Sequence, residues 1–255
     1  MLLIIETLLI LAALGQDHRA AAEDTEYTLD MAPDSVDDRY YGCEKKMADL
    51  VDKKYLAMEK NNSPNFKAAW IVADKETSKL KFFSKLSRQQ KIAIKVCADD
   101  NVRSEFSRDT RNGKQSFKDN TYKWYSLHFL LTEAIQILKK KENKCFDTFR
   151  GTNDKFTYES GEVGFGSFAS TSLDRERAKR FGRISCFEIH TCEGADVSEY
   201  STYPDEKEVL IPPYEKFNVA VKKKTDDPNL WCETVYILKS SGIRNDMNCA
   251  LFNAH

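Results

Sequence analysis

The chain has 255 residues, enough for one large domain or two small ones with a sizeable core. Its 39 Lys and Arg and 40 Asp and Glu give a net charge of −1, so bulk charge offers no argument for a nucleic-acid partner. Hydrophobic residues make up 41% of the chain, with only ten Gly and six Pro, and this composition does not imply long disorder.

The first 15 residues predict a signal peptide. They form a short apolar run ending in Ala13-Leu14-Gly15, with small residues where a signal peptidase requires them. The run is shorter than the ~20 apolar residues that cross a bilayer, and the carboxyl end has no hydrophobic tail for a lipid anchor. We expect a secreted, extracellular monomer without a membrane anchor, cleaved after Gly15 or as late as Ala22. Because the run carries Glu6 and lacks a basic start, a buried helix is the alternative.

Residues 16–42 predict a mobile lead-in. The segment is polar and acidic, with Asp34, Asp37 and Asp38 among few residues that could pack. A single folded domain is expected to follow over residues 43–255.

From Cys43 to about Lys140 the pattern predicts helices. Near the start of this region, apolar residues recur at three- and four-residue steps and define one helix face: Met47, Leu50, Val51, Tyr55 and Met58. Further helices are expected over residues 87–99 and 121–140, with a strand as the alternative around Ile92, Ile94 and Val96. His128 lies on the apolar face of the last helix, where a hydrogen-bonded core histidine is expected rather than a catalytic one.

After residue 144 the pattern predicts strands. Five short segments are rich in β-branched and aromatic residues: 145–150, 184–189, 208–211, 217–221 and 234–238. A short helix is expected over residues 174–181. Helices followed by strands, without regular βαβ alternation, predict an α+β fold.

Seven cysteines fit an exported, oxidised protein, and the odd number leaves at least one thiol without an internal partner. No Cys-x-x-Cys pair occurs, and the four histidines show no His-Glu-x-x-His spacing. His190 and Cys192 could share a metal but lack a second pair of ligands, so no metal is expected.

Two motifs in the strand-rich half suit nucleotide binding. Arg150 stands at the end of a predicted strand, where a guanidinium can bind a diphosphate while Gly151 lets the backbone approach. Ser170, Thr171 and Ser172 precede the short helix and offer donors and acceptors to a ribose or an amide. An exposed turn and a helix N-cap are the structural alternatives.

Glu206 and Glu208 form a pair of carboxylates beside a predicted strand. Residues two apart on a strand face the same way, so both side chains are expected to project into one site. Paired carboxylates suit chemistry that passes through an oxocarbenium-like sugar cation. In a chain with 31% charged residues, a Glu-Lys-Glu run also occurs as a solvated surface.

In this order the motifs resemble the active-site signature of the arginine-specific ecto-mono-ADP-ribosyltransferases: Arg, then Ser, then Glu-x-Glu. The similarity extends over most of the chain from Cys43 to Cys249. It implies a catalytic domain over residues 43–255, with two small sheets around an NAD cleft. It also implies an enzyme that cleaves NAD, or NADP as the alternative nucleotide, without a metal and passes ADP-ribose to arginine side chains of proteins.

The resemblance also implies how the nucleotide is held. Arg150 and Gly151 would bind the diphosphate. Ser170 would fix the nicotinamide ribose, helped by Thr171 and Ser172.

The resemblance assigns the chemistry to the carboxylates. Glu208 would stabilise the developing sugar cation, and Glu206 would orient the target guanidinium and help to remove its proton. Tyr203, in the preceding loop, would contact the protein target. The alternatives are an NAD glycohydrolase with the same site and a catalytically silent binding module. A toxin-like use against other cells is a hypothesis from analogy.

For the cysteines, the resemblance implies that Cys43 pairs with Cys249 and Cys145 with Cys192. The remaining three fall outside this scheme, and either two of them pair or all are buried thiols: Cys97, Cys186 and Cys232. At Cys97-Ala98 the family has an aromatic residue that lines the nucleotide pocket, so this chain departs from the pattern there.

Overall fold

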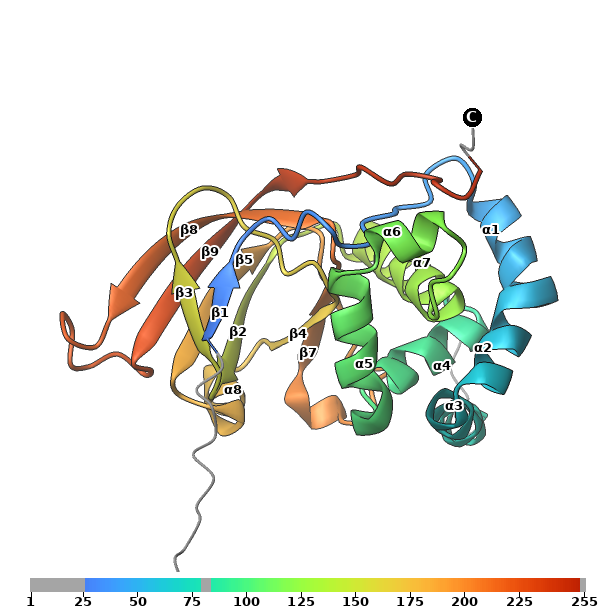
Figure 1. The fold of residues 1–255 in the computed structure, drawn as a ribbon. Helices are drawn as coiled ribbons and strands as arrows, with labels where there is room; N and C mark the ends of the chain where they lie inside the picture. The colour runs from blue at the N-terminus through green and yellow to red at the C-terminus, as the bar shows by residue number, and fades with distance from the viewer. Residues whose placement is uncertain (1–25, 79–83, 253–255) are drawn as a thin grey trace, which may run out of the picture.

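The computed structural model describes residues 26–78 and 84–252, and the predicted signal peptide lies outside them. Helices form one part of the molecule and a sheet forms the other (Figure 1). The helical part contains α1 (Glu44–Leu50), the π-helical η1 (Val51–Tyr55), α2 (Leu56–Asn62), α3 (Pro64–Thr77), α4 (Arg88–Cys97), α5 (Asp100–Arg111), α6 (Lys114–Lys118) and α7 (Tyr125–Glu142).

The other part contains the strands and three short helical segments. The strands are β1 (Glu26–Leu29), β2 (Phe146–Thr152), β3 (Lys155–Tyr158), β4 (Ala169–Ser172), β5 (Ser185–Thr191), β6 (Ala195–Asp196), β7 (Glu208–Ile211), β8 (Glu215–Lys223) and β9 (Thr234–Ile243). The helical segments are α8 (Arg175–Ala178), η2 (Lys179–Phe181) and η3 (Pro204–Glu206).

Seven strands form one sheet in the order β6-β7-β4-β2-β5-β9-β8, and β1 pairs with β3 in a second sheet of two strands. Neighbours in the large sheet are antiparallel except β5 and β9, which run parallel. The α+β prediction is confirmed, although the two sheets are unequal. The order places β4 and β7 in the half of the large sheet nearer the helices (Figure 1).

Most of the predicted elements are present. The apolar face that begins after Cys43 belongs to the continuous run of α1, η1 and α2, and the segment 208–211 is β7. α4 begins where Ser87 and Gln90 form a reciprocal capping box. Three helices were not predicted: α3, whose first residue Pro64 follows the N-cap Ser63, α5 and α6.

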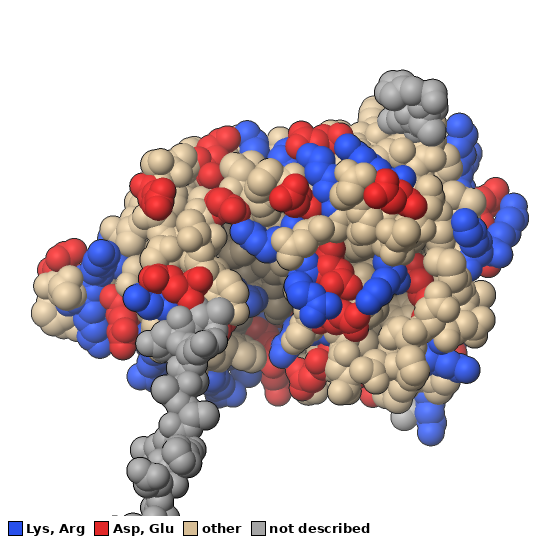
Figure 2. All heavy atoms as spheres, viewed as in Figure 1, with Lys and Arg blue, Asp and Glu red and all other residues tan. Residues whose placement is uncertain are grey.

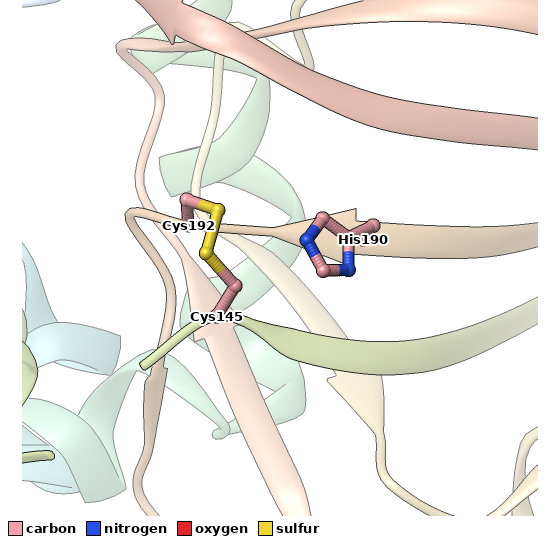
Figure 3. Close-up of side chains that lie close together, drawn as sticks. All are labelled: Cys145, His190 and Cys192. Carbon is pink, nitrogen blue, oxygen red and sulfur yellow. A yellow bond between two sulfur atoms is a disulfide. The ribbon is translucent and has the colours of Figure 1, made fainter. Parts of the chain in front are cut away.

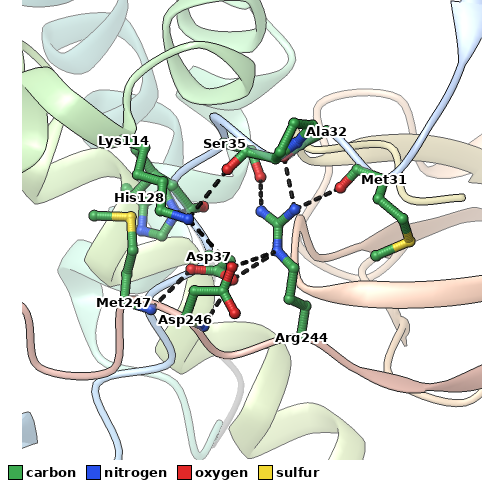
Figure 4. A network of polar contacts seen from close by, with 11 residues as sticks. Met31, Ala32, Ser35, Asp37, Lys114, His128, Arg244, Asp246 and Met247 are labelled. Atoms are coloured by element: carbon green, nitrogen blue, oxygen red, sulfur yellow. Dashed lines mark hydrogen bonds and ion pairs between the residues drawn. The ribbon is translucent and has the colours of Figure 1, made fainter.

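Residues 26–42 pack against the body, so the prediction of a mobile lead-in is wrong for this segment. Val36 and Asp37 are fully buried. Asp37 accepts from the Arg244 Nε at 2.8 Å and from the backbone N–H of Met247 at 3.1 Å (Figure 4). Polar residues look solvent-facing in a sequence, but here a guanidinium from the far end of the chain satisfies the buried carboxylate.

A second carboxylate ties the same two segments together. Asp38 accepts from the backbone N–H groups of Tyr40, Cys249 and Ala250 at 2.7, 2.9 and 3.1 Å. The Cys43–Cys249 disulfide closes beside it. Asp37, Asp38, Arg244 and this disulfide are called the terminal clasp below. Burial raises the pKa of Asp38 to about 6, because desolvation outweighs the three donors.

His128 is a core residue of α7, as the sequence predicts. Its Nε2 donates to the carbonyl of Val36 at 3.0 Å, and its Nδ1 accepts from the Tyr40 hydroxyl at 2.8 Å. Burial lowers the pKa of His128 to about 4, so the ring is neutral at pH 7 and binds the segment before α1 to α7.

Charged side chains of both signs are interspersed over the face in Figure 2, in keeping with the net charge of −1. Within the described part of the chain, no helix combines the length and the apolar character that a membrane crossing requires.

The N-terminus of α7 is capped from another helix. Trp124 occupies its N-cap position without a side-chain cap, and Glu59 of α2 instead accepts the Ser126 N–H at 2.9 Å. A carboxylate at a helix N-terminus is normally stabilised in its ionised form. Here the side chain is 3% exposed, and burial raises the pKa of Glu59 to about 8. Desolvation therefore outweighs the helix terminus, and the cap is mostly neutral at pH 7.

The raised pKa of Glu59 makes the free energy of unfolding depend on pH. The folded pKa lies above the model value of 4.5, so the contribution is present at low pH and is lost as the pH rises from 4.5 through 8. Glu59→Gln keeps an acceptor for Ser126 and removes the titration. Between pH 4.5 and pH 9, we expect the free energy of unfolding of the variant to gain roughly 3–5 kcal/mol on that of the parent.

Urea denaturation of both proteins at pH 4.5, 7 and 9 measures this difference. Parallel stability profiles of parent and variant would show that Glu59 does not titrate in this range.

Candidate active site

The antiparallel pairing of β4 with β7 brings the serine and glutamate motifs together. Ser172 lies opposite Glu208, and Ser170 lies opposite Leu210. Since residues two apart on a strand share a face, Ser170 and Ser172 project on the same side. The Ser170 side chain acts on Glu208 as a hydrogen-bonding neighbour that lowers its pKa. Two motifs separated by more than thirty residues in the sequence therefore form one site.

Glu208 is the buried carboxylate of this site. It is 7% exposed, and the Ser201 hydroxyl donates to its Oε2 at 3.3 Å. Burial raises the pKa of Glu208, and the charge of Glu206 raises it further, whereas hydrogen bonds from Ser170 and Ser201 lower it. A carboxylate held by hydroxyl donors in a poorly solvated position suits the stabilisation of an adjacent positive charge.

Glu206 does not lie on a strand, so the expectation that both carboxylates share a strand face is wrong. It ends η3, and Lys207 then adopts a left-handed backbone conformation with φ of +48° before β7 begins. The turn leaves Glu206 half-buried, whereas Glu208 is buried. The two carboxylates still interact electrostatically. The Glu206 side chain is thus partly accessible at the surface, whereas the Glu208 side chain lies inside the protein.

Arg150 lies on β2, next to β4 in the sheet. Its Nη1 donates to the carbonyl oxygen of Ser170 at 2.7 Å. Across residues 26–78 and 84–252, Arg150 forms no ion pair within 4.0 Å. Burial lowers the pKa of this guanidinium, and the charge of Arg103 on α5 lowers it further. A bound anion would relieve both effects.

Gly151 has a structural role that differs from the predicted approach to a ligand. A Cβ at this position would lie 2.5 Å from the carbonyl oxygens of Ala178 and Gly182. Glycine is needed at this position because the short helices α8 and η2 pack directly on β2.

The hydroxyls of Thr171 and Ser172 are committed to the protein backbone. Thr171 donates to the Val209 carbonyl at 2.8 Å, and Ser172 donates to the Glu206 carbonyl at 2.6 Å. Asp174 caps α8 by accepting the Glu176 N–H at 3.0 Å. Ser170 is thus the member of the motif whose hydroxyl faces Glu208, and the other two hold the strand and loop in place.

The loop before η3 contains a residue that sequence reasoning missed. Ser201 donates to Glu208 and accepts the Tyr203 N–H at 3.1 Å, so it joins the buried carboxylate to the loop. Tyr203 is 55% exposed at the loop tip, as expected. Arg103 of α5 was also missed as a site neighbour, and only the fold brings its charge near Glu208 and Arg150.

The structure contains the expected Cys43–Cys249 and Cys145–Cys192 disulfides. Sequence left three cysteines open, and the structure resolves them: Cys186 pairs with Cys232, and Cys97 is free. Cys97 ends α4, and burial together with the nearby charge of Glu208 raises the pKa of its thiol. A small thiol thus stands beside the site, where an aromatic residue was expected.

Comparisons with known proteins agree with this fold and site. Residues 29–232 match the family described as NAD:arginine ADP-ribosyltransferase. NAD(P)(+)–arginine ADP-ribosyltransferase 2 of Gallus gallus is 36% identical over 75% of this chain and 64% of its own length. Ecto-ADP-ribosyltransferase 4 of Homo sapiens is 31% identical over 97% of this chain and 80% of its own length. The chain thus spans just under two thirds of the chicken relative.

The crystal structure of the eukaryotic mono-ADP-ribosyltransferase ART2.2 superposes with a TM-score of 0.76 at 27% identity, covering 89% of this chain and all of that one. The chain belongs to the NAD:arginine ADP-ribosyltransferase family. Two variants of ART2.2 have been solved in complex with NADH and with NAD.

The close packing at Gly151 predicts that Gly151→Ala is destabilising. The added methyl would meet two backbone carbonyls at 2.5 Å, and α8 with η2 must move outward. We expect a loss of about 1–3 kcal/mol in the free energy of unfolding, measured by denaturant titration. Gly164→Ala is the matched control, because its Cβ would have its nearest contact at 3.4 Å. Equal effects of the two changes would contradict the packing argument.

Proposed function

We propose that this protein cleaves NAD and transfers ADP-ribose to arginine side chains of other proteins, releasing nicotinamide. The observation that carries the proposal is the buried Glu208 carboxylate, bonded to Ser201 and flanked by Ser170, beside the half-buried Glu206. Family membership and the nucleotide complexes of ART2.2 support the same reaction. The names of the relatives include NAD(P), so NADP is the alternative substrate.

Arg150 would bind the diphosphate. It is a guanidinium without a carboxylate partner among the described residues, its bonded acceptor is the neutral Ser170 carbonyl, and Arg103 adds a second positive charge nearby. Guanidinium groups bind phosphate oxygens through several parallel N–H donors.

Glu208 would act on the ribose. Cleavage of the bond between nicotinamide and ribose leaves positive charge on the sugar, and an ionised carboxylate against the ribose hydroxyls stabilises that charge most in the transition state. Ser170 would orient the same ribose through the hydroxyl that contacts Glu208. Thr171 and Ser172 would act indirectly, because their hydroxyls bind the backbone.

Glu206 and Tyr203 would serve the acceptor. A guanidinium deprotonates with difficulty, so its attack on the sugar requires a carboxylate that orients it and removes a proton. Glu206 is half-buried at the end of η3, three residues from the exposed Tyr203 ring. This arrangement places a carboxylate where an arginine from a docked protein can reach it.

We propose further that the protein is secreted and works outside the cell. Three disulfides favour an oxidising compartment. Several relatives are named ecto-ADP-ribosyltransferases, and one from Mus musculus is named GPI-linked. Extracellular NAD and protein arginines would be the substrates, with no metal required. A toxin-like role remains a further hypothesis, tested by modification of foreign cell-surface proteins.

The reaction is tested with labelled NAD and agmatine, a small arginine analogue, beside Glu206→Ala. We expect the parent to label agmatine and the variant to lose at least ~10-fold in transfer while still releasing nicotinamide. Glu199→Ala, which removes an exposed carboxylate in the same loop region, is the matched control and should retain transfer.

Two other outcomes would indicate a different function. Nicotinamide release by the parent without labelled agmatine would identify an NAD glycohydrolase. Neither product from folded protein would identify a binding module.

Ser201→Ala should move the pH dependence of nicotinamide release. The Ser201 hydroxyl lowers the pKa of Glu208, so its loss raises that pKa, and a higher pH is needed to ionise the carboxylate. We expect the acidic limb of the rate profile to move upward by about 0.5–1 pH unit, in line with one lost hydrogen bond. Ser201→Thr should restore the parent profile.

Ser198→Ala serves as the control, because that hydroxyl contacts only the backbone carbonyl of Glu208. An unshifted acidic limb in Ser201→Ala would mean that Ser201 does not act on Glu208.

A further inference from the structure

A cluster of metal-binding side chains lies at the joined ends of β2 and β5, apart from the proposed active site. Cys145 directly precedes β2, Cys192 directly follows β5, and His190 lies in β5 two residues before Cys192. The potential ligand atoms of these three residues lie within 4.8 Å of one another. Figure 3 shows the His190 ring turned toward the two sulfur atoms, which form a disulfide in this structure.

Asp147 orients the imidazole. Its Oδ1 lies 2.7 Å from the His190 Nδ1, so this nitrogen carries the proton and donates to the carboxylate. The other nitrogen, Nε2, faces the sulfur atoms (Figure 3). Metal-bound histidines commonly show this arrangement, in which a carboxylate fixes the tautomer and raises the basicity of the ligating nitrogen.

The backbone around the two cysteines is held independently of their disulfide. Phe146 pairs with Thr191 in the β2–β5 ladder, one residue from each cysteine. The buried Glu215 accepts the Cys192 N–H at 2.7 Å and the Glu193 N–H at 3.1 Å. Reduction therefore leaves the two thiols close together, on strands that remain paired.

This disulfide is also the one that a reductant reaches first. Cys145 is exposed and Cys192 is half-buried. The four cysteines of the other two bridges are buried: Cys43, Cys249, Cys186 and Cys232. Thiol–disulfide exchange requires access of the attacking thiolate to a sulfur atom, so burial protects those bridges in the folded protein.

We propose that reduction converts this corner into a Zn²⁺ site made of Cys145, Cys192 and His190, with water as the fourth ligand. Two molecules of a small thiol supply the two electrons and two protons, forming two cysteine thiols and one oxidised thiol dimer. Zn²⁺ then binds both sulfurs as thiolates, releases their two protons, and takes the free Nε2 of the imidazole. The metal then links β2 to β5 in place of the disulfide, so these two strand ends stay connected in both redox states.

The experiment uses the whole protein in a Cys97→Ser background, which removes the only other free thiol described. Limited phosphine treatment reduces the exposed bridge, and alkylation with mass spectrometry verifies which cysteines are free. Competition with a chromophoric chelator then measures Zn²⁺ affinity, and Co²⁺ provides a spectrum of thiolate ligation. We expect one tight site per chain in the reduced protein and none in the oxidised protein.

Variants test each part of the site. His190→Ala should weaken Zn²⁺ binding at least ~10-fold, and Asp147→Asn should weaken it by about 10-fold through the imidazole. Asp119→Asn, an exposed carboxylate elsewhere, should have no effect. Equal Zn²⁺ affinity in oxidised and reduced protein, or an unchanged affinity in His190→Ala, would overturn the proposal. If reduction abolishes the circular dichroism of the fold, its recovery with Zn²⁺ supports the proposal, and failure to recover overturns it.

Discussion

The pairing of β4 with β7 determines the geometry of the whole site. Its register sets Ser172 against Glu208 and leaves Ser170 in reach of the same carboxylate. β2 lies on the other side of β4, which brings Arg150 to the Ser170 carbonyl. A slip of one residue would turn every side chain of β4 to the opposite face and separate the guanidinium, the hydroxyl and the carboxylate. The backbone bonds of Thr171 and Ser172 oppose such a slip.

The desolvation of Glu208 sets the electrostatic character of this arrangement. Burial raises its pKa, and two serine hydroxyls offset part of that effect. The same burial strengthens the interaction of an ionised carboxylate with any cation formed beside it, because little water is present to screen the charge. Glu206, one turn earlier and half-buried, keeps solvent access. Two glutamates separated by one residue thus have different environments because Lys207 reverses the backbone between them.

The sequence predicted those elements whose patterns are local. The apolar period of the first helices, the β-branched strands and the order of Arg150, Ser170 and the Glu-x-Glu motif are all visible along the chain. What the sequence missed depends on distant partners. Asp37 looked like a solvated acid because its partner Arg244 lies at the other end of the chain. Gly151 looked like a ligand contact because the sequence showed the short helix but not its packing on β2. No pattern in the sequence pointed to Ser201 as a hydrogen-bond donor to Glu208.

The terminal clasp has a consequence for protease resistance. Its disulfide joins residue 43 to residue 249, so almost the whole described chain lies inside one covalent ring. A protease that cuts one exposed loop, such as the turn that links β8 to β9, opens the ring but releases no fragment. Both pieces stay attached, and the strand pairing and the buried clasp carboxylates hold them in register. Loss of material from the folded body then requires a second cut, or a cut together with reduction of a buried disulfide.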